Sequence, residues 1–456
     1  MRALRLLAAS TAMLCAAAAG QTPWNVPVPP LPQTEPPPHP KPHPKIFDLY
    51  PQQPSLTPAF TIRVGALGFH SPGSFYLLRR RALVSLDFLD ENRLLFTFRK
   101  PALERRDAEN ADTAMARQIQ ALVLSLPDGK VETQALLTVP DQARYLWMLR
   151  DGHFLLRDQA GLEQCDATLK PQPYLHLPGR LLWIAMDPEQ QVIVTNSLEP
   201  ATAPPPTSGE AIGPSSGQAA AAAGAQKPGP REMLVVRTLR METGKSIKES
   251  RVPWAAQTND WPVNSQGYVE SVRGNGAQWT LNLDSFSGAG KALGQVDSTC
   301  LPDAAFAAET ELIVKTCVVG GGGDLTAMTV PDGARTWQAI TATNAMWPQL
   351  VMAPDGSRLA LETLLLKRPA TAYKRKRLIG AQDLEGQMVR VMDAADGKVE
   401  LEAPLRPILD GGGNVSISPS GRRVAILNDG AIEVFELPPP ARMPATGAAV
   451  TPASQH

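Results

Sequence analysis

Histidine and cysteine are scarce in this chain of 456 residues, which holds six of the first and four of the second. It has no His-Glu-x-x-His motif and no Cys-x-x-Cys pair, so the common zinc signatures are missing. An Asp-x-Asp-x-Asp calcium loop is missing as well. From motifs alone we therefore predict no metal site, no cofactor and no catalytic residue.

Two strings that look catalytic stand in unsuitable places. Residues 213–217 (GPSSG) match the nucleophile-elbow pattern, but they lie in a low-complexity stretch with no strand before it and no helix after it. The run Gly320 to Gly323 is not followed by Lys-Ser or Lys-Thr, so it is not a phosphate loop. We expect this run to link two strands of one sheet.

An excess of charge of one sign is also lacking. Lysine and arginine together number 44, and so do aspartate and glutamate. Near-neutral charge argues against nucleic acid as a partner. Beyond the first twenty residues no apolar run is long enough to cross a bilayer, so we expect a chain that does not span a membrane. We also expect it to be a monomer.

The first twenty residues have the pattern of a secretory signal peptide. Arg2 and Arg5 precede an apolar run, and the small residues Ala18 and Gly20 suit a signal peptidase. We predict cleavage between Gly20 and Gln21 and a periplasmic or secreted protein. An uncleaved membrane anchor is the alternative.

Three cysteines remain after such cleavage. Export makes a disulfide chemically possible, and Cys300 and Cys317 are close in sequence, so they are the preferred pair. Cys165 would then be free. The alternative is three buried thiols.

Proline is dense between residues 21 and 58. Because proline fixes φ and donates no hydrogen bond, we predict a disordered, extended tether rather than a domain. His39 and His43 in this stretch could touch a metal, but two histidines on a disordered chain make a poor site, so a solvated spacer is the preferred interpretation. Residues 438–456 form a similar low-complexity tail.

Between residues 60 and 437 short apolar runs alternate with turn residues. One turn pattern, clearest at 353–360 (APDGSRLA) and 418–425 (SPSGRRVA), is followed by an apolar strand. A second pattern ends apolar strands in Asp-Gly turns, as at 122–130 (LVLSLPDGK). Asp-Gly tolerates the positive φ of tight turns, so both patterns predict β-hairpins.

The spacing of these hairpins predicts the architecture. Three stretches interrupt the pattern, at 101–117, 200–230 and 367–386. Without them the first pattern recurs about every 44 residues, which is a propeller period. We predict an all-β fold, a single β-propeller of about seven four-stranded blades over 60–437. Residues 60–67 are expected to supply the fourth strand of the last blade and so close the ring.

The chain resembles the WD/YVTN-like family of β-propeller repeats. The resemblance rests on residues 353–360, on 416–421 (SISPSG) and on the Asp-Gly-Lys turns. No Trp-Asp dipeptide ends the blades, and the Gly-His element of WD repeats is absent. The resemblance implies a propeller, and the family includes scaffolds, peptide binders, surface proteins and some enzymes.

Propellers commonly bind ligands at one mouth of the central channel. The candidate loop residues for a protein or saccharide partner are Trp254, Asp260, Trp261, Asn344, Trp347 and Asn414. Trp261 and Trp347 each precede a proline, which suggests equivalent places in two blades. Alternatively, these tryptophans fill the interfaces between blades.

A basic loop offers a second candidate site. Lys374, Arg375, Lys376 and Arg377 follow one another and could meet an anionic partner. The alternative is a solvated loop.

Taken together, the sequence predicts an exported, non-catalytic propeller that binds a protein or ligand or acts as a scaffold in or beyond the cell envelope. The alternative is a propeller enzyme, such as a lyase, hydrolase or oxidoreductase, with its site at a channel mouth. A purely structural surface protein is a third interpretation.

Overall fold

The structure is a computed structural model. It describes residues 44–48, 56–72, 83–99, 116–140, 144–158, 161–200, 232–253, 261–373, 379–409 and 411–440. The chain divides into two units, Met1–Pro42 and His43–His456, and all described residues belong to the second. The predicted signal segment, most of the predicted tether and most of the tail lie outside the described residues.

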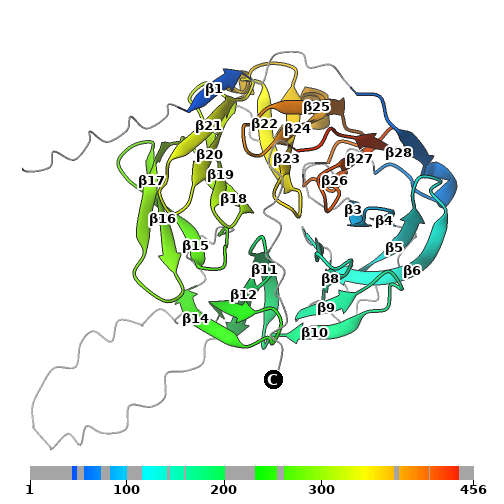
Figure 1. Ribbon diagram of the computed structural model, residues 1–456, viewed down its shortest axis with the longest axis horizontal. Helices are drawn as coiled ribbons and strands as arrows, with labels where there is room; N and C mark the ends of the chain where they lie inside the picture. The colour runs from blue at the N-terminus through cyan, green and yellow to red at the C-terminus, as the bar shows by residue number, and fades with distance from the viewer. Residues whose placement is uncertain are drawn as a thin grey trace, which may run out of the picture. The chain divides into compact units, whose positions relative to one another are not determined.

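Seven small sheets, each of antiparallel strands apart from one added edge strand, stand in a ring around a central axis (Figure 1). The described residues contain no α-helix. The prediction of an all-β propeller with seven blades is therefore confirmed. Alternating apolar residues in each strand explain the arrangement, since neighbouring blades bury both faces of a sheet.

The strands of the first four blades, from the centre of the ring outward, are as follows. Blade 1 holds β3 (Ser85–Asp90), β4 (Arg93–Arg99), β5 (Ala116–Ser125) and β6 (Val131–Pro140); blade 2 holds β7 (Leu146–Met148), β8 (Phe154–Arg157), β9 (Gly161–Cys165) and β10 (Gln172–His176); blade 3 holds β11 (Arg180–Met186), β12 (Val192–Pro200), β13 (Glu232–Arg240) and β14 (Ser246–Pro253); blade 4 holds β15 (Gly267–Arg273), β16 (Gln278–Ser285) and β17 (Lys291–Asp297).

The remaining three blades follow the same order. Blade 5 holds β18 (Asp303–Ala308), β19 (Glu311–Cys317), β20 (Gly323–Thr329) and β21 (Arg335–Ile340); blade 6 holds β22 (Ala345–Met352), β23 (Arg358–Leu366), β24 (Leu384–Asp393) and β25 (Val399–Pro404); blade 7 holds β26 (Val415–Ile417), β27 (Arg423–Asn428), β28 (Ala431–Glu436) and β2 (Phe60–Arg63).

Blade 4 departs from the predicted four strands. Its innermost position is taken by a short segment that forms a β-bridge between Val263 and Tyr268 but no regular strand. The backbone N–H of Val269 also donates to Pro262 O at 2.9 Å. Since Pro262 has no N–H to donate, a regular ladder cannot extend through it.

The ring closes through the start of the described domain. Strand β2 pairs with β28, and Phe60 lies opposite Val434. Ile62 of β2 is buried in one cluster with Leu124 of blade 1 and Leu427 of blade 7. The prediction that residues near 60 complete the last blade is confirmed, and one blade is thereby built from both ends of the ring.

Strand β1 (Lys45–Asp48) is a difference from the sequence expectation. These residues were expected in the disordered tether of 21–58, but they pair in parallel with β21 at the outer edge of blade 5. The physical reason is that a sheet edge presents unpaired backbone groups, and Lys45–Asp48 contains no proline that would prevent pairing.

The turns between first and second strands of the blades meet at one rim of the ring, which we call the turn face. Both predicted turn patterns lie there, because in antiparallel blades the turns between third and fourth strands share that rim. Gly356, with φ of +73°, comes so close to Ala307 O that a Cβ would collide with it. Across the ring, Arg150 Nη2 donates to Pro354 O at 2.9 Å, joining blades 2 and 6.

The opposite rim, which we call the loop face, carries the connections between second and third strands and those between blades. All three predicted insertions fall between a second and a third strand, namely β4 and β5, β12 and β13, and β23 and β24. Their bounds shift slightly, because Ala116 already begins β5 and Leu384 begins β24. Long connections gathered on one rim are typical of the binding face of a repeat fold.

Part of the third insertion lies within the described residues. The short 3₁₀ segments Ala370–Tyr373 and Ala381–Asp383 flank the undescribed residues 374–378. Ala370, Tyr373 and Ile379 pack against the buried Leu364 and Leu366 of β23. Within the described ranges, no helix reaches the length and apolarity needed to cross a membrane.

Candidate functional site

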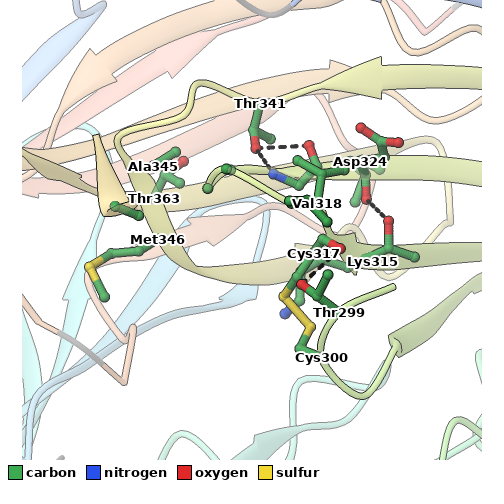
Figure 2. Close-up of a pocket in the computed structure, with 18 of the residues that line it drawn as sticks. Thr299, Cys300, Lys315, Cys317, Val318, Asp324, Thr341, Ala345, Met346 and Thr363 are labelled. Carbon is green, nitrogen blue, oxygen red and sulfur yellow. Dashed lines mark hydrogen bonds between the residues drawn. A yellow bond between two sulfur atoms is a disulfide. The ribbon is translucent and has the colours of Figure 1, made fainter. Parts of the chain in front are cut away.

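A pocket of about 470 Å³ opens on the loop face between blades 5 and 6 (Figure 2). It is lined by the turn after β17, the ends of β19 and β20, the start of blade 6 and the first 3₁₀ segment. Its walls are mainly apolar, with Leu325, Met346 and Leu361 among them. A pocket of this size fits a bulky side chain or a small molecule.

A disulfide forms one wall of the pocket. Cys300 and Cys317 are bonded, with Cα atoms 5.5 Å apart, so the structure contains the disulfide that sequence proximity predicts. Thr299 N donates to Cys317 O at 2.9 Å beside it. Cys165 is a buried free cysteine, as expected, and burial raises the pKa of its thiol to about 12.

The glycine run forms the rim of the pocket. It connects β19 to β20 within blade 5, as the sequence predicts. Gly321 has φ of +104°, and a Cβ at this position would collide with Thr343 O. Val319 beside it is 84% exposed, so an apolar side chain stands in solvent at the entrance. Such a rim lets another chain approach the backbone closely.

The polar groups of the pocket have partners within the protein. Lys315 Nζ lies 2.6 Å from Asp303 Oδ2, and Asp324 Oδ2 accepts a hydrogen bond from Gln338 Nε2 at 2.8 Å. Thr341 Oγ1 accepts a hydrogen bond from Gly323 N at 2.7 Å. These contacts fix the walls and leave apolar burial as the main source of binding free energy.

A buried carboxyl group lies on the other side of β23. Glu362 is fully buried, and a Cβ added at Gly412 would lie 3.5 Å from its Oε1. Gln387 Nε2 lies 3.3 Å from Glu362 Oε2, and Asn414 Nδ2 lies 3.3 Å from Gln387 Oε1. Burial raises the pKa of Glu362 to about 8, which favours the protonated carboxyl group.

The predicted site residues do not form one constellation. Trp254 and Asp260 lie outside the described residues, and Trp347 lies in β22 with a side chain that is not described. Trp261 stacks on Tyr268 with ring centroids 5.1 Å apart and packs against blade 3. For Trp261, these contacts match the alternative that it fills an interface between blades.

The two predicted asparagines hold loops of the loop face. Asn344 Nδ2 donates to Leu366 O at 2.9 Å beside the pocket, and Asn414 Nδ2 donates to Pro407 O at 3.0 Å. The basic residues Lys374, Arg375, Lys376 and Arg377 lie outside the described residues. Over the described ranges, no group of three or more His, Cys, Asp or Glu side chains could hold a metal ion.

Sequence reasoning identified the glycine run and the disulfide but did not bring them together as a pocket. The link is visible only in the fold, because Thr299 and Val318 lie in two different connections and Met346 lies in β22 of the next blade. The available signal was the apolar Val318-Val319 pair followed directly by glycine, which is unusual in a solvent-facing turn.

No protein-family model matches the sequence, and no curated protein is significantly similar to it. Solved structures with similar folds include the acylaminoacyl peptidase of Pyrococcus horikoshii, at 10% identity and a TM-score of 0.42 over 76% of this chain and 50% of that one. The β-propeller domain of the trilobed protease from Pyrococcus furiosus matches at 8% identity and a TM-score of 0.40 over 80% and 98%. A chain of the mitotic checkpoint complex matches at 9% identity and a TM-score of 0.41, over 86% of this chain and 99% of that one.

These likenesses concern the fold, and this chain spans about half the length of the acylaminoacyl peptidase chain. They also correct one expectation. The sequence predicts a non-catalytic binding or scaffolding module, whereas three of the matched structures are acylaminoacyl peptidases. The reasoning failed because the lack of a catalytic motif within a propeller does not separate enzymes from other propeller proteins.

Proposed function

We propose that this chain is itself a propeller enzyme of the hydrolase class and that the pocket between blades 5 and 6 holds an apolar side chain of the substrate. The observation that carries the proposal is the pocket itself, about 470 Å³ in volume and open on the loop face. Most of its polar groups already have partners within the protein. A substrate is therefore selected by apolar shape rather than by charge.

The rim of the pocket suits an extended substrate. Gly320 and Gly321 have no side chains, so a substrate backbone can lie close to them. The exposed Val319 would be covered when an apolar group binds. Burying that side chain together with the substrate adds roughly 25 cal/mol for each Å² removed from water. Leucine or phenylalanine side chains are the probes that fit best.

The test is hydrolysis of a series of chromogenic peptide amides and esters with Gly, Asp, Leu or Phe at the varied position. The full chain should act on at least one member, with a higher kcat/KM for Leu or Phe than for Gly or Asp. Val319→Asp places a charge at the entrance and should lower kcat/KM for the apolar substrates about tenfold or more.

Val272→Asp is the matched control, because Val272 is also exposed but lies in β15 of blade 4. This variant should keep the rates and the preference of the wild type. Failure of the wild type to hydrolyse any member of the series would contradict the proposal. Equal loss in both variants would place the effect outside the pocket.

We also propose that the protein works outside the cytoplasm and is related to the WD/YVTN-like repeats. The first part is supported by Arg2, Arg5 and the apolar run that follows them. The second is supported by the turn sequences of the last two blades. N-terminal sequencing of the exported protein tests the first part, and a mature chain that starts at Gln21 is the expected result.

A further inference from the structure

Two carboxyl groups from non-adjacent blades meet on the turn face. Asp187 follows β11 of blade 3, and Glu309 follows β18 of blade 5. Asp187 is only 2% exposed, and its Oδ1 accepts a hydrogen bond from Val192 N at 2.6 Å. Glu309 Oε2 accepts two hydrogen bonds from Ser265 of blade 4, from N at 2.9 Å and from Oγ at 2.6 Å.

The second oxygen of each carboxyl group lacks a donor. Asp187 Oδ2 and Glu309 Oε1 are both buried with no hydrogen-bond partner, and the two groups are within hydrogen-bonding reach of each other. Ionised carboxylates only accept hydrogen bonds, so two of them facing each other would repel and stay unsatisfied. A proton on one of them supplies the missing donor.

The described groups that hydrogen-bond to Asp187 and to Glu309 are neutral. Strand β12 contributes backbone N–H groups, and the blade 4 turn contributes the neutral Asn264 and Ser265. The guanidinium of Arg150 in blade 2 donates to Pro354 O. Glu189 in the same turn as Asp187 is exposed and accepts from Gln191 Nε2 at 2.8 Å.

We propose that Asp187 and Glu309 share one proton, which clasps the turns of blades 3 and 5 together across blade 4 on the turn face. The protonated carboxyl group donates a hydrogen bond to the other carboxyl group. Loss of this proton leaves two negative charges in contact. Burial, followed by the charge of Glu309, raises the pKa of Asp187 to about 6. The inference does not depend on the proposed hydrolase function.

Because the pKa of Asp187 is raised, the clasp weakens as the pH rises. The folded-state pKa of Asp187 lies above its ordinary value of 3.8, so the clasp contributes its full stability below about pH 4. That contribution is lost as the pH rises through about 6. Above this value the turn face carries the repulsion of two carboxylates, so the contact between these two turns weakens.

The test is the melting temperature of the full chain between pH 4.5 and pH 8 for the wild type and Asp187→Asn. The amide of the variant donates a hydrogen bond to Glu309 at every pH. We expect the variant to melt about 3 °C or more above the wild type at pH 8 and to lose that advantage at pH 4.5. The difference between the two proteins removes the contributions of all other titrating groups.

Glu189→Gln is the matched control and should follow the wild type at every pH. A constant difference between Asp187→Asn and the wild type would overturn the proposal. So would stabilisation of the wild type by calcium or magnesium chloride at pH 8 that the variant does not show, since the pair would then hold a cation. If Asp187→Asn does not fold, Glu309→Gln, which also supplies an amide donor, decides by the same criteria.

Discussion

Arg358 Nη1 donates a hydrogen bond to Gly421 O at 2.7 Å, so a guanidinium that is fully buried joins blade 6 to the first turn of blade 7. The same group pairs with Glu400 through Nε at 2.5 Å and donates to Pro438 O through Nη2 at 2.5 Å. Arg358 thus connects two blades and the segment that leaves the ring. Each of its three side-chain nitrogens donates to an oxygen of the protein, as a buried charge requires.

Arg358→Met should lower the free energy of unfolding by about 3–5 kcal/mol, because Glu400 would stay buried without its partner. Chemical denaturation measures this change. The neighbouring Arg422 is exposed, so Arg422→Met should change stability by less than about 0.5 kcal/mol. Similar losses in both variants would show that Arg358 does not connect the blades as described.

Glu362→Gln should change how stability depends on pH. The folded-state pKa of Glu362 is about 8, above its ordinary 4.5, so the wild type loses stability as the pH rises through this range. We expect the variant to match the wild type near pH 4.5 and to exceed it by on the order of 3 kcal/mol at pH 9. Denaturant titrations at the two pH values measure the difference.

Glu385→Gln provides the control for this prediction, since Glu385 lies in the adjacent strand β24 with an exposed side chain. It should leave the pH dependence unchanged. Parallel curves for Glu362→Gln and the wild type from pH 4.5 to 9 would mean that the carboxyl group is ionised in the folded protein.

Replacing both Cys300 and Cys317 by serine should lower the free energy of unfolding by about 2–4 kcal/mol, because the bond restricts the unfolded chain. The same change loosens one wall of the pocket. We therefore expect weaker hydrolysis of apolar substrates as well as a lower melting temperature. Treatment with a reducing agent should reproduce both effects in the wild type and neither in the variant.

Ile62→Ala should destabilise the ring by about 2–4 kcal/mol, since Ile62 is buried where β2 completes blade 7 against blade 1. Leu56→Ala is the control, because Leu56 is exposed just before this strand. A thermal melt of each variant checks the prediction. An unchanged midpoint for Ile62→Ala would mean that the ring does not depend on its N-terminal strand.

The repeat architecture could be predicted because its signals are local. Turns such as Asp355-Gly356 and Ser420-Gly421 each predict a hairpin from two residues alone. In the structure Gly356 and Gly421 have the positive φ that such turns require, +73° and +69°. Their regular recurrence then fixed the number of blades. The closing strand was predictable for a related reason, since the last blade lacked one strand in the sequence.

The features that could not be predicted from the sequence depend on contacts between distant parts of the chain. The strand at Lys45–Asp48 pairs with blade 5 through backbone groups that no side-chain pattern marks. The meeting of Asp187 and Glu309 depends on how two turns point across blade 4. Trp261 could be placed near a blade boundary, but its stacking on Tyr268 decides between binding and packing.

The most direct test of the proposed hydrolase role is a crystal structure of the full chain with a short peptide amide carrying phenylalanine or leucine. We predict that the apolar side chain lies in the pocket, between the glycine run at Gly320–Gly323 and Met346 of blade 6. A peptide bound only at the turn face, or an empty pocket at a peptide concentration that saturates hydrolysis, would contradict the account.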